Sequence, residues 1–286
     1  EFLIKDNEFL NACVNADDYV LQGKVVHIPQ AGAASGVQRN RSTLPGVAVQ
    51  RGDTDVTYVI DEYTTDPVHI PNKDTAELSY DKRQSVLNQD MLALKETAAN
   101  NVLHLWGKDL TTAERILTTG TAATATGSGM TGNRKKLTED DIRAAMTKLN
   151  RDNVPQAGRF MSITADQLSE LLENVNTKAA FYNHPNLSEG VVGRLYGFDF
   201  FVRSTVLRFD TGGTIKLPEA ADAATDNSAA LFWQKGVVER AFGDVMMFED
   251  KANPLYYGDL YSFLVRLGGR ARRGDRKGLG FVLQAP

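Results

Sequence analysis

The chain has 286 residues, of which 42% are hydrophobic and 24% charged, a composition that is ordinary for a globular protein with a sizeable core. Its formal net charge of −4 at pH 7 gives no global sign of a nucleic-acid or membrane-surface binder. No apolar run approaches the roughly 20 residues of a transmembrane helix, and the single cysteine excludes a disulfide within the chain. That residue, Cys13, lies between Leu10 and Val14 and is expected to be a small core residue and not a nucleophile.

Residues 1–22 are expected to form an arm or a short helix, after which the chain enters a long β-hairpin at 23–73. One arm of the hairpin runs through Lys24–Ile28 and the other through Val56–Ile60. The tip between the arms is rich in glycine and alanine and carries Arg39, Arg41 and Arg51. An arm of about 20 residues would reach roughly 60 Å, whereas an isolated two-stranded hairpin is only marginally stable in water. The tip is therefore expected to lie on a partner, such as another subunit.

A long helix is predicted from about residue 80 to Trp106, with Gly107 as a natural stop. Its apolar residues recur at the spacing of one helix face: Leu87, Met91, Leu94, Ala98, Val102 and Leu105. Two starts are possible: the capping-box spacing of Asp74–Glu77, or Ser79 with Asp81. A helix on the order of 40 Å long without a sustained heptad is expected to be a spine on which other elements pack.

The segment 108–136 is predicted to be a loop because threonine, glycine and alanine dominate it. A small α/β layer is expected next, because helix signals there alternate with a strand. It comprises a helix capped by Thr138, a strand at Arg159–Ile163, and a helix from Ala165 to Asn174 capped by Thr164. Later predicted strands are a hairpin in Val191–Val206 that turns at Tyr196–Gly197, two runs within Ala230–Phe248, the run Leu255–Leu267 and a closing strand Leu279–Leu283.

One motif could indicate chemistry: Gly127–Gly132 matches G-x-G-x-x-G. A dinucleotide site needs a strand directly before this motif and a helix directly after it. The preceding residues 121–126 are weak strand formers, so a flexible loop is favoured, and a nucleotide-binding enzyme remains the alternative. The four histidines, His27, His69, His104 and His184, do not occur at metal-ligand spacing. We therefore expect no cofactor, no metal and no catalytic set.

A basic turn is the strongest local charge feature of the sequence. Residues 266–277 contain five arginines and one lysine against one aspartate, a local charge of +5 (6 − 1). The cations beyond Leu267 are Arg270, Arg272, Arg273, Arg276 and Lys277. Three readings stay open: an interface with carboxylates, contact with phosphates, or a solvated turn.

The order of these elements resembles the major capsid proteins of tailed bacteriophages, which have the Hong Kong 97-type fold. The resemblance covers nearly the whole chain and includes the phrases at Leu137–Ile142, Arg159–Leu168 and Gly190–Val202. It implies an α+β fold with an N-terminal arm (1–22), an extended E-loop β-hairpin (23–73), a peripheral domain with the spine helix (74–110), an axial α/β domain (111–250) and a return to the peripheral domain (251–286).

The resemblance also implies a structural protein and not an enzyme. Such a protein assembles through pentamers and hexamers into an icosahedral shell that encloses phage double-stranded DNA, with weak, non-specific DNA contact. The hairpin tip would then lie on a neighbouring subunit, where Arg39, Arg41 and Arg51 would meet acidic groups such as Asp90 or Glu96 of the spine helix. The basic turn would lie between capsomers.

Further partners that the resemblance implies are scaffold, prohead protease, portal and decoration proteins, with assembly in the host cytoplasm and no membrane. The start at Glu1 in place of methionine fits proteolytic loss of an N-terminal segment. An encapsulin-like compartment protein, which shares the fold, is an alternative reading.

Overall fold

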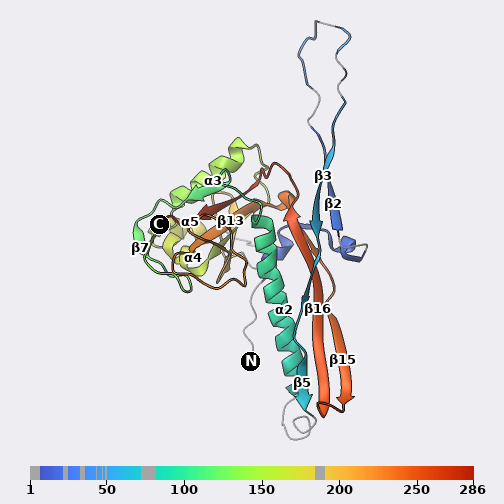
Figure 1. The fold of residues 1–286 in the computed structure, drawn as a ribbon. Helices are drawn as coiled ribbons and strands as arrows, with labels where there is room; N and C mark the ends of the chain where they lie inside the picture. The colour runs from blue at the N-terminus through green and yellow to red at the C-terminus, as the bar shows by residue number, and fades with distance from the viewer. Residues whose placement is uncertain are drawn as a thin grey trace.

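The computed structural model describes residues 7–21, 25–32, 36–42, 44–46, 48, 50–71, 82–183 and 191–286. Figure 1 shows a globular α/β part beside an elongated part, in which a long helix lies along long strands and a hairpin extends beyond the body. Among the described residues, no helix combines the length and the apolar character that a membrane span requires. His184 and the predicted helix starts at 74–81 lie outside the described residues.

The elongated part is built on the strand β16 (Gly258–Ala271), which has 14 residues. Its partners in a six-stranded sheet are β1 (Val14–Asn15), β4 (Asp61–Thr64), β5 (Val68–Pro71), β14 (Val238–Phe242) and β15 (Met246–Asn253). Leu267 pairs with both β14 and β4, and Tyr261 pairs with both β15 and β5. Strands β14 and β15 therefore follow one edge of β16, and β4 and β5 follow the other.

The spine helix α2 (Lys82–Gly107) lies along this sheet (Figure 1). Its 26 residues confirm the predicted long helix and its end at Gly107. Leu94, Ala98 and Val102 on its predicted apolar face are buried. Trp106 in the last turn is also buried, and its ring centroid lies 5.4 Å from that of Trp233. The helix therefore joins the elongated sheet to the α/β part through one continuous core.

The α/β part contains a seven-stranded sheet. Its order is β10 (Gly193–Leu195), β11 (Phe198–Arg203), β9 (Arg159–Thr164), β13 (Asn227–Gln234), β17 (Leu279–Leu283) and β6 (Arg115–Leu117), with β12 (Leu207–Phe209) also on β13. The helices are α3 (Glu139–Arg151), α4 (Ala165–Leu171) and α5 (Val175–Tyr182). Because side chains alternate along a strand, Phe232 packs with α3 and α4 while Trp233 faces the core shared with α2.

Several local predictions are confirmed. Thr138 and Thr164 each form a capping box at a helix start, and Tyr196–Gly197 turns the β10–β11 hairpin with φ of 50° and 81°. Cys13 is buried, and burial raises its thiol pKa to about 12. The N-terminal arm contains two short 3-10 turns, Glu8–Asn11 and Asp17–Leu21, on either side of β1.

Three predictions differ from the structure. The segment 108–136 is not a plain loop, because it contains β6, β7 (Ala122–Thr124) and β8 (Asn133–Lys135). The closing strand β17 does not return to the sheet of β16, because it pairs with β13 and β6 in the seven-stranded sheet. The predicted boundary at residue 250 between the axial domain and the return to the peripheral domain also differs from the strand pairing. Strands β14 and β15 begin before this boundary, yet both belong to the six-stranded sheet of β16. A third short 3-10 turn, Lys235–Val237, leads from one sheet into the other.

Candidate functional site

The hairpin packs on its own subunit at the base, whereas the described residues of its tip are exposed. Strands β2 (Val25–Gln30) and β3 (Thr54–Val59) pair in an antiparallel register from Val25–Val59 to Gln30–Thr54. Pro29 is tolerated because a two-stranded ribbon leaves an edge on each strand. Near this ribbon's distal end, His27 Nδ1 lies 2.7 Å from the Asp55 carboxylate, and both side chains are exposed.

The base of the hairpin is docked on its own subunit. One face of the ribbon buries Val26, Ile28 and Tyr58, each at most 4% exposed, against Val20 and Ala241 of the body. The opposite face leaves Val25 and Val59 exposed by 49% and 57%. One face of the ribbon is therefore an ordinary core face, which was not predicted from the sequence.

The tip has no such core. Every described residue from 36 to 50 is exposed, and the apolar side chains of Val37 and Leu44 are 97% and 80% exposed. Arg39 and Arg41 are exposed as well. Arg51 differs from them, because its guanidinium forms an ion pair with Asp53 at 2.6 Å within the same hairpin, which lowers the pKa of that carboxyl.

The acidic residues proposed as partners lie on α2. Asp90 is partly buried, and this burial raises the pKa of its carboxyl. Glu96 is also only partly exposed. That Asp90 and Glu96 contact the hairpin of a neighbouring subunit stays a prediction.

The basic turn is largely neutralised by its own chain. Arg270 pairs with Asp109 at 3.0 Å, Arg272 with Glu239 at 2.9 Å, Arg273 with Asp275 at 2.7 Å, and Arg276 lies 4.0 Å from Glu114. Arg270 lies inside β16, so the turn begins later than predicted. Lys277 is exposed. Because four of the five cations have carboxylate neighbours in the same subunit, the local charge of the sequence overstates what the turn offers to a partner.

The glycine motif Gly127–Gly132 does not lie in the context of a dinucleotide site. It joins β7 to β8, so a strand and not a helix follows it. Gly129 and Gly132 have φ of 68° and 80°, values that glycine adopts without strain. The motif is therefore the turn of a short hairpin, and the nucleotide-binding alternative loses its structural support.

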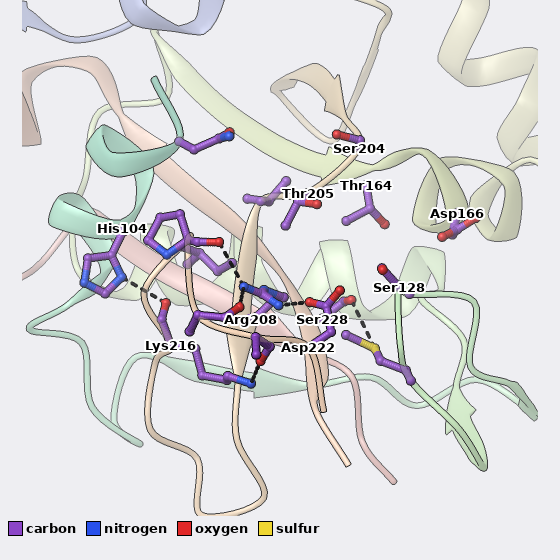
Figure 2. A pocket seen from close by; sticks show the side chains of 18 residues that line it. His104, Ser128, Thr164, Asp166, Ser204, Thr205, Arg208, Lys216, Asp222 and Ser228 are labelled. Carbon is purple, nitrogen blue, oxygen red and sulfur yellow. Dashed lines mark hydrogen bonds and ion pairs between the residues drawn. The ribbon is translucent and has the colours of Figure 1, made fainter. Parts of the chain in front are cut away.

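A cavity of about 410 Å³ lies beside this turn, between the end of α2, the start of α4 and the loop 216–222 (Figure 2). Two cations of its lining are paired within the same chain: Arg208 pairs with Asp222 and donates to three backbone carbonyls, and Lys216 pairs with the buried Asp226 at 2.6 Å. His104 Nδ1 lies 3.1 Å from the Lys216 carbonyl, and burial lowers the imidazole pKa. These contacts tie the loop to the body.

The remaining described histidines are not brought together as ligands. His27 is on the hairpin, and His69 lies beside Tyr256 with ring centroids 5.8 Å apart. In the described part of the chain, no group of three or more His, Cys, Asp or Glu side chains could hold a metal ion.

Further exposed apolar side chains, which the sequence did not predict, lie along the edge strand β15 and in the turn that joins it to β16, and this turn is at the end of the two strands that points away from the hairpin (Figure 1). These side chains are Met246, Met247, Phe248, Leu255, Tyr256 and Tyr257, each between 43% and 82% exposed. The strand pattern alone does not reveal their exposure, because it depends on β15 being the edge strand. The described part of the chain thus exposes apolar side chains both at the hairpin tip and along β15 and its turn, which is typical of a subunit that contacts other subunits at different surfaces.

Two sheets joined by a spine helix, with a hairpin that leaves the body, are the architecture that the sequence resemblance predicts for a shell-forming capsid protein. The model of the phage capsid protein family matches residues 5–247, and the chain belongs to this family. The predicted Hong Kong 97-type resemblance is thereby confirmed, and the protein is a major capsid shell protein.

Solved capsid structures share the fold. That of the cyanophage P-SCSP1u matches with a TM-score of 0.68 and 19% identity over 99% of this chain and 89% of that chain. The cyanophage Pam1 capsid matches with a TM-score of 0.67 and 10% identity over 99% and 93%. The capsid of an empty GTA particle matches with a TM-score of 0.65 and 10% identity over 100% and 92%. No curated protein sequence matches the chain significantly.

Proposed function

We propose that the protein assembles through pentamers and hexamers into an icosahedral shell that encloses phage double-stranded DNA, and that it acts as a structural protein without catalysis. The observation that carries this proposal is the hairpin tip, whose described residues 36–50 are all exposed in the single subunit. An extended, uncovered tip gains order and buries its apolar side chains when a neighbour lies beneath it. Contacts between two different surfaces of one subunit close into rings.

In this arrangement the hairpin of one subunit lies on the next. Arg39 and Arg41, which are exposed, supply charge to that contact, and Asp90 or Glu96 of the neighbour's α2 supplies the acidic side. Arg51 contributes less than they do, because Asp53 already neutralises it.

Assembly in the host cytoplasm would involve scaffold, prohead protease and portal proteins, with decoration proteins on the finished shell. Contact with packaged DNA would be weak and non-specific, since the chain carries a net charge of −4. The basic turn contributes to contacts between capsomers mainly through Lys277, whose side chain is exposed.

The test is direct. The purified chain, with its scaffold where one is needed, is followed by light scattering and negative-stain electron microscopy under assembly conditions. Closed shells are expected, and particles recovered from infected cells should contain double-stranded DNA. A chain that remains a compact monomer contradicts the proposal, and shells that contain a protein cargo and no DNA contradict the phage-head assignment.

A further inference from the structure

A buried carboxylate lies at the point where the hairpin leaves the body. Glu239, in β14, has a side chain that is only 5% exposed. Its Oε1 accepts a hydrogen bond of 3.1 Å from the hydroxyl of Tyr58 in β3, and its Oε2 lies 2.9 Å from Nε of Arg272. Its backbone carbonyl accepts from Nε1 of Trp106 at the end of α2, at 2.9 Å. One residue thus contacts the hairpin, the spine helix and the basic turn.

Residues at the end of β16 and in the basic turn also contact the hairpin. Arg270 donates to the Thr57 carbonyl of β3 while it pairs with Asp109, which follows the end of α2. Gln30, the last residue of β2, donates from Nε2 to the Arg272 carbonyl and accepts from the Gly274 N–H. Both strands of the ribbon are therefore held by residues 270–274.

The hydrogen bonds among these contacts are directional, whereas the apolar contacts are not, and the contact of Arg272 Nε with Glu239 is an ion pair without a hydrogen bond. The cluster of Val26, Ile28 and Tyr58 stabilises the base by burial, which depends little on angle. A buried carboxylate is stable only while its partners satisfy it, so tilting the ribbon would leave the charge of Glu239 without Tyr58. The direction of the hairpin is consequently tied to the polar contacts.

We propose that Tyr58, Glu239, Arg270, Arg272 and Gln30 form a hinge clasp that sets the direction in which the hairpin leaves its subunit. This inference rests on the proposed function, because a hairpin that lies on the next subunit transmits its direction to the position of that subunit. The clasp residues are positioning residues for shell geometry. The cations of the basic turn that the sequence suggested for contacts with partners thus act chiefly inside their own subunit.

The experiment compares Arg272→Gln and Tyr58→Phe with the matched control Arg273→Gln. Arg273 is the neighbouring cation, and its partner Asp275 lies outside the clasp. Tyr58→Phe keeps the ring in the apolar cluster and removes only the hydroxyl that contacts Glu239, so it guards against a variant that fails to fold.

The first readout is hydrogen exchange of the unassembled protein. Tyr58→Phe, which loses a hydrogen bond to a charged group, should exchange the amides of β2 and β3 about tenfold faster or more. Arg272→Gln, which leaves the buried Glu239 without its ion pair, should also exchange them faster, and in both variants β9 and β13 keep their protection. Arg273→Gln should match the wild type. Unchanged exchange in β2 and β3, or an equal rise throughout the protein, overturns the clasp.

The second readout is the diameter of the assembled shells by electron microscopy. The clasp variants should give a broader range of diameters, or open and irregular particles, whereas Arg273→Gln gives wild-type shells. Wild-type diameters despite faster hairpin exchange overturn the link to shell geometry. If the wild-type chain itself forms no shells, the proposed function fails, and the exchange comparison still decides whether the clasp exists.

Discussion

Removal of the hairpin tip separates the stability of the subunit from its assembly. The deletion of residues 36–50 takes out Arg39, Arg41 and the exposed apolar side chains of Val37 and Leu44. It keeps the Arg51–Asp53 ion pair and the hydrogen bond from the Gly32 N–H to Asp53. No described residue of the deleted segment is buried in its own subunit, so the body should lose almost no apolar burial.

The expected magnitude follows from the length of the loop. The segment 31–53 between β2 and β3 has 23 residues, and removing 15 of them leaves 8. The entropy of closing the loop falls by (3/2)RT ln(23/8), which is about 0.9 kcal/mol in favour of the folded state. Since surface changes usually alter stability by less than about 0.5 kcal/mol, the free energy of unfolding should stay constant or rise by up to about 1 kcal/mol.

Urea unfolding of the unassembled protein measures the first quantity, and electron microscopy of the assembly reaction measures the second. The deletion should fold normally and form no stable shells. A full-length control with Arg39→Glu and Arg41→Glu keeps the loop length, and it should keep the stability and weaken assembly. A deletion that lowers the free energy of unfolding by more than about 2 kcal/mol refutes the reasoning, because the tip would then belong to its own core, and normal shells from the deletion refute the role in assembly.

Two further predictions concern the body. Trp233→Phe removes a fully buried indole that donates to a backbone carbonyl, so it should lower the free energy of unfolding, measured in urea, by about 2–3 kcal/mol. The exposed control Tyr257→Phe should change this free energy by less than about 0.5 kcal/mol, and equal effects of the two variants would contradict the core assignment. Burial raises the pKa of the Asp226 carboxyl, but the Lys216 ammonium and a backbone N–H together lower it below its usual range. The stabilisation by the ionised carboxyl is therefore present above pH about 4 and is lost as the pH falls through the folded pKa. In unfolding measurements from pH 7 to pH 3, the difference in the free energy of unfolding between the wild type and Asp226→Asn should be largest at pH 7. A difference that is constant across this range would contradict the ion pair.

The elements that could be predicted from the sequence are those whose signals are local. Helix α2 was recognisable because its apolar residues repeat along one face and Gly107 follows them. Thr138 and Thr164 were recognisable as caps because each is followed three residues later by a side chain that completes a capping box. The Tyr196–Gly197 turn combines a glycine with flanking strand formers.

The elements that were missed depend on partners far away in the chain. Strand β6 consists of three residues and exists because it pairs in parallel with β17, more than 160 residues later. Strand β17 has five buried residues and no alternation, so its sequence does not indicate which sheet it enters. The partners of the basic turn are also distant in the sequence, with Asp109 and Glu114 more than 160 residues and Glu239 33 residues away, so the local charge of the turn does not reveal them.

The hairpin shows why local and remote information must be combined. Its sequence indicates two strands and an uncovered tip, yet the core that holds its base comes from Val20 and Ala241, and the polar contacts come from Glu239 and Arg272. The ribbon is held by its own subunit at one end and is exposed at the other. In the proposed assembly, a neighbour that binds the tip can change the direction of the ribbon only by breaking contacts at the base. Because the base contacts are directional, a neighbour that binds the tip must also accept the angle that the base imposes, and the geometry of assembly is therefore decided partly inside each subunit.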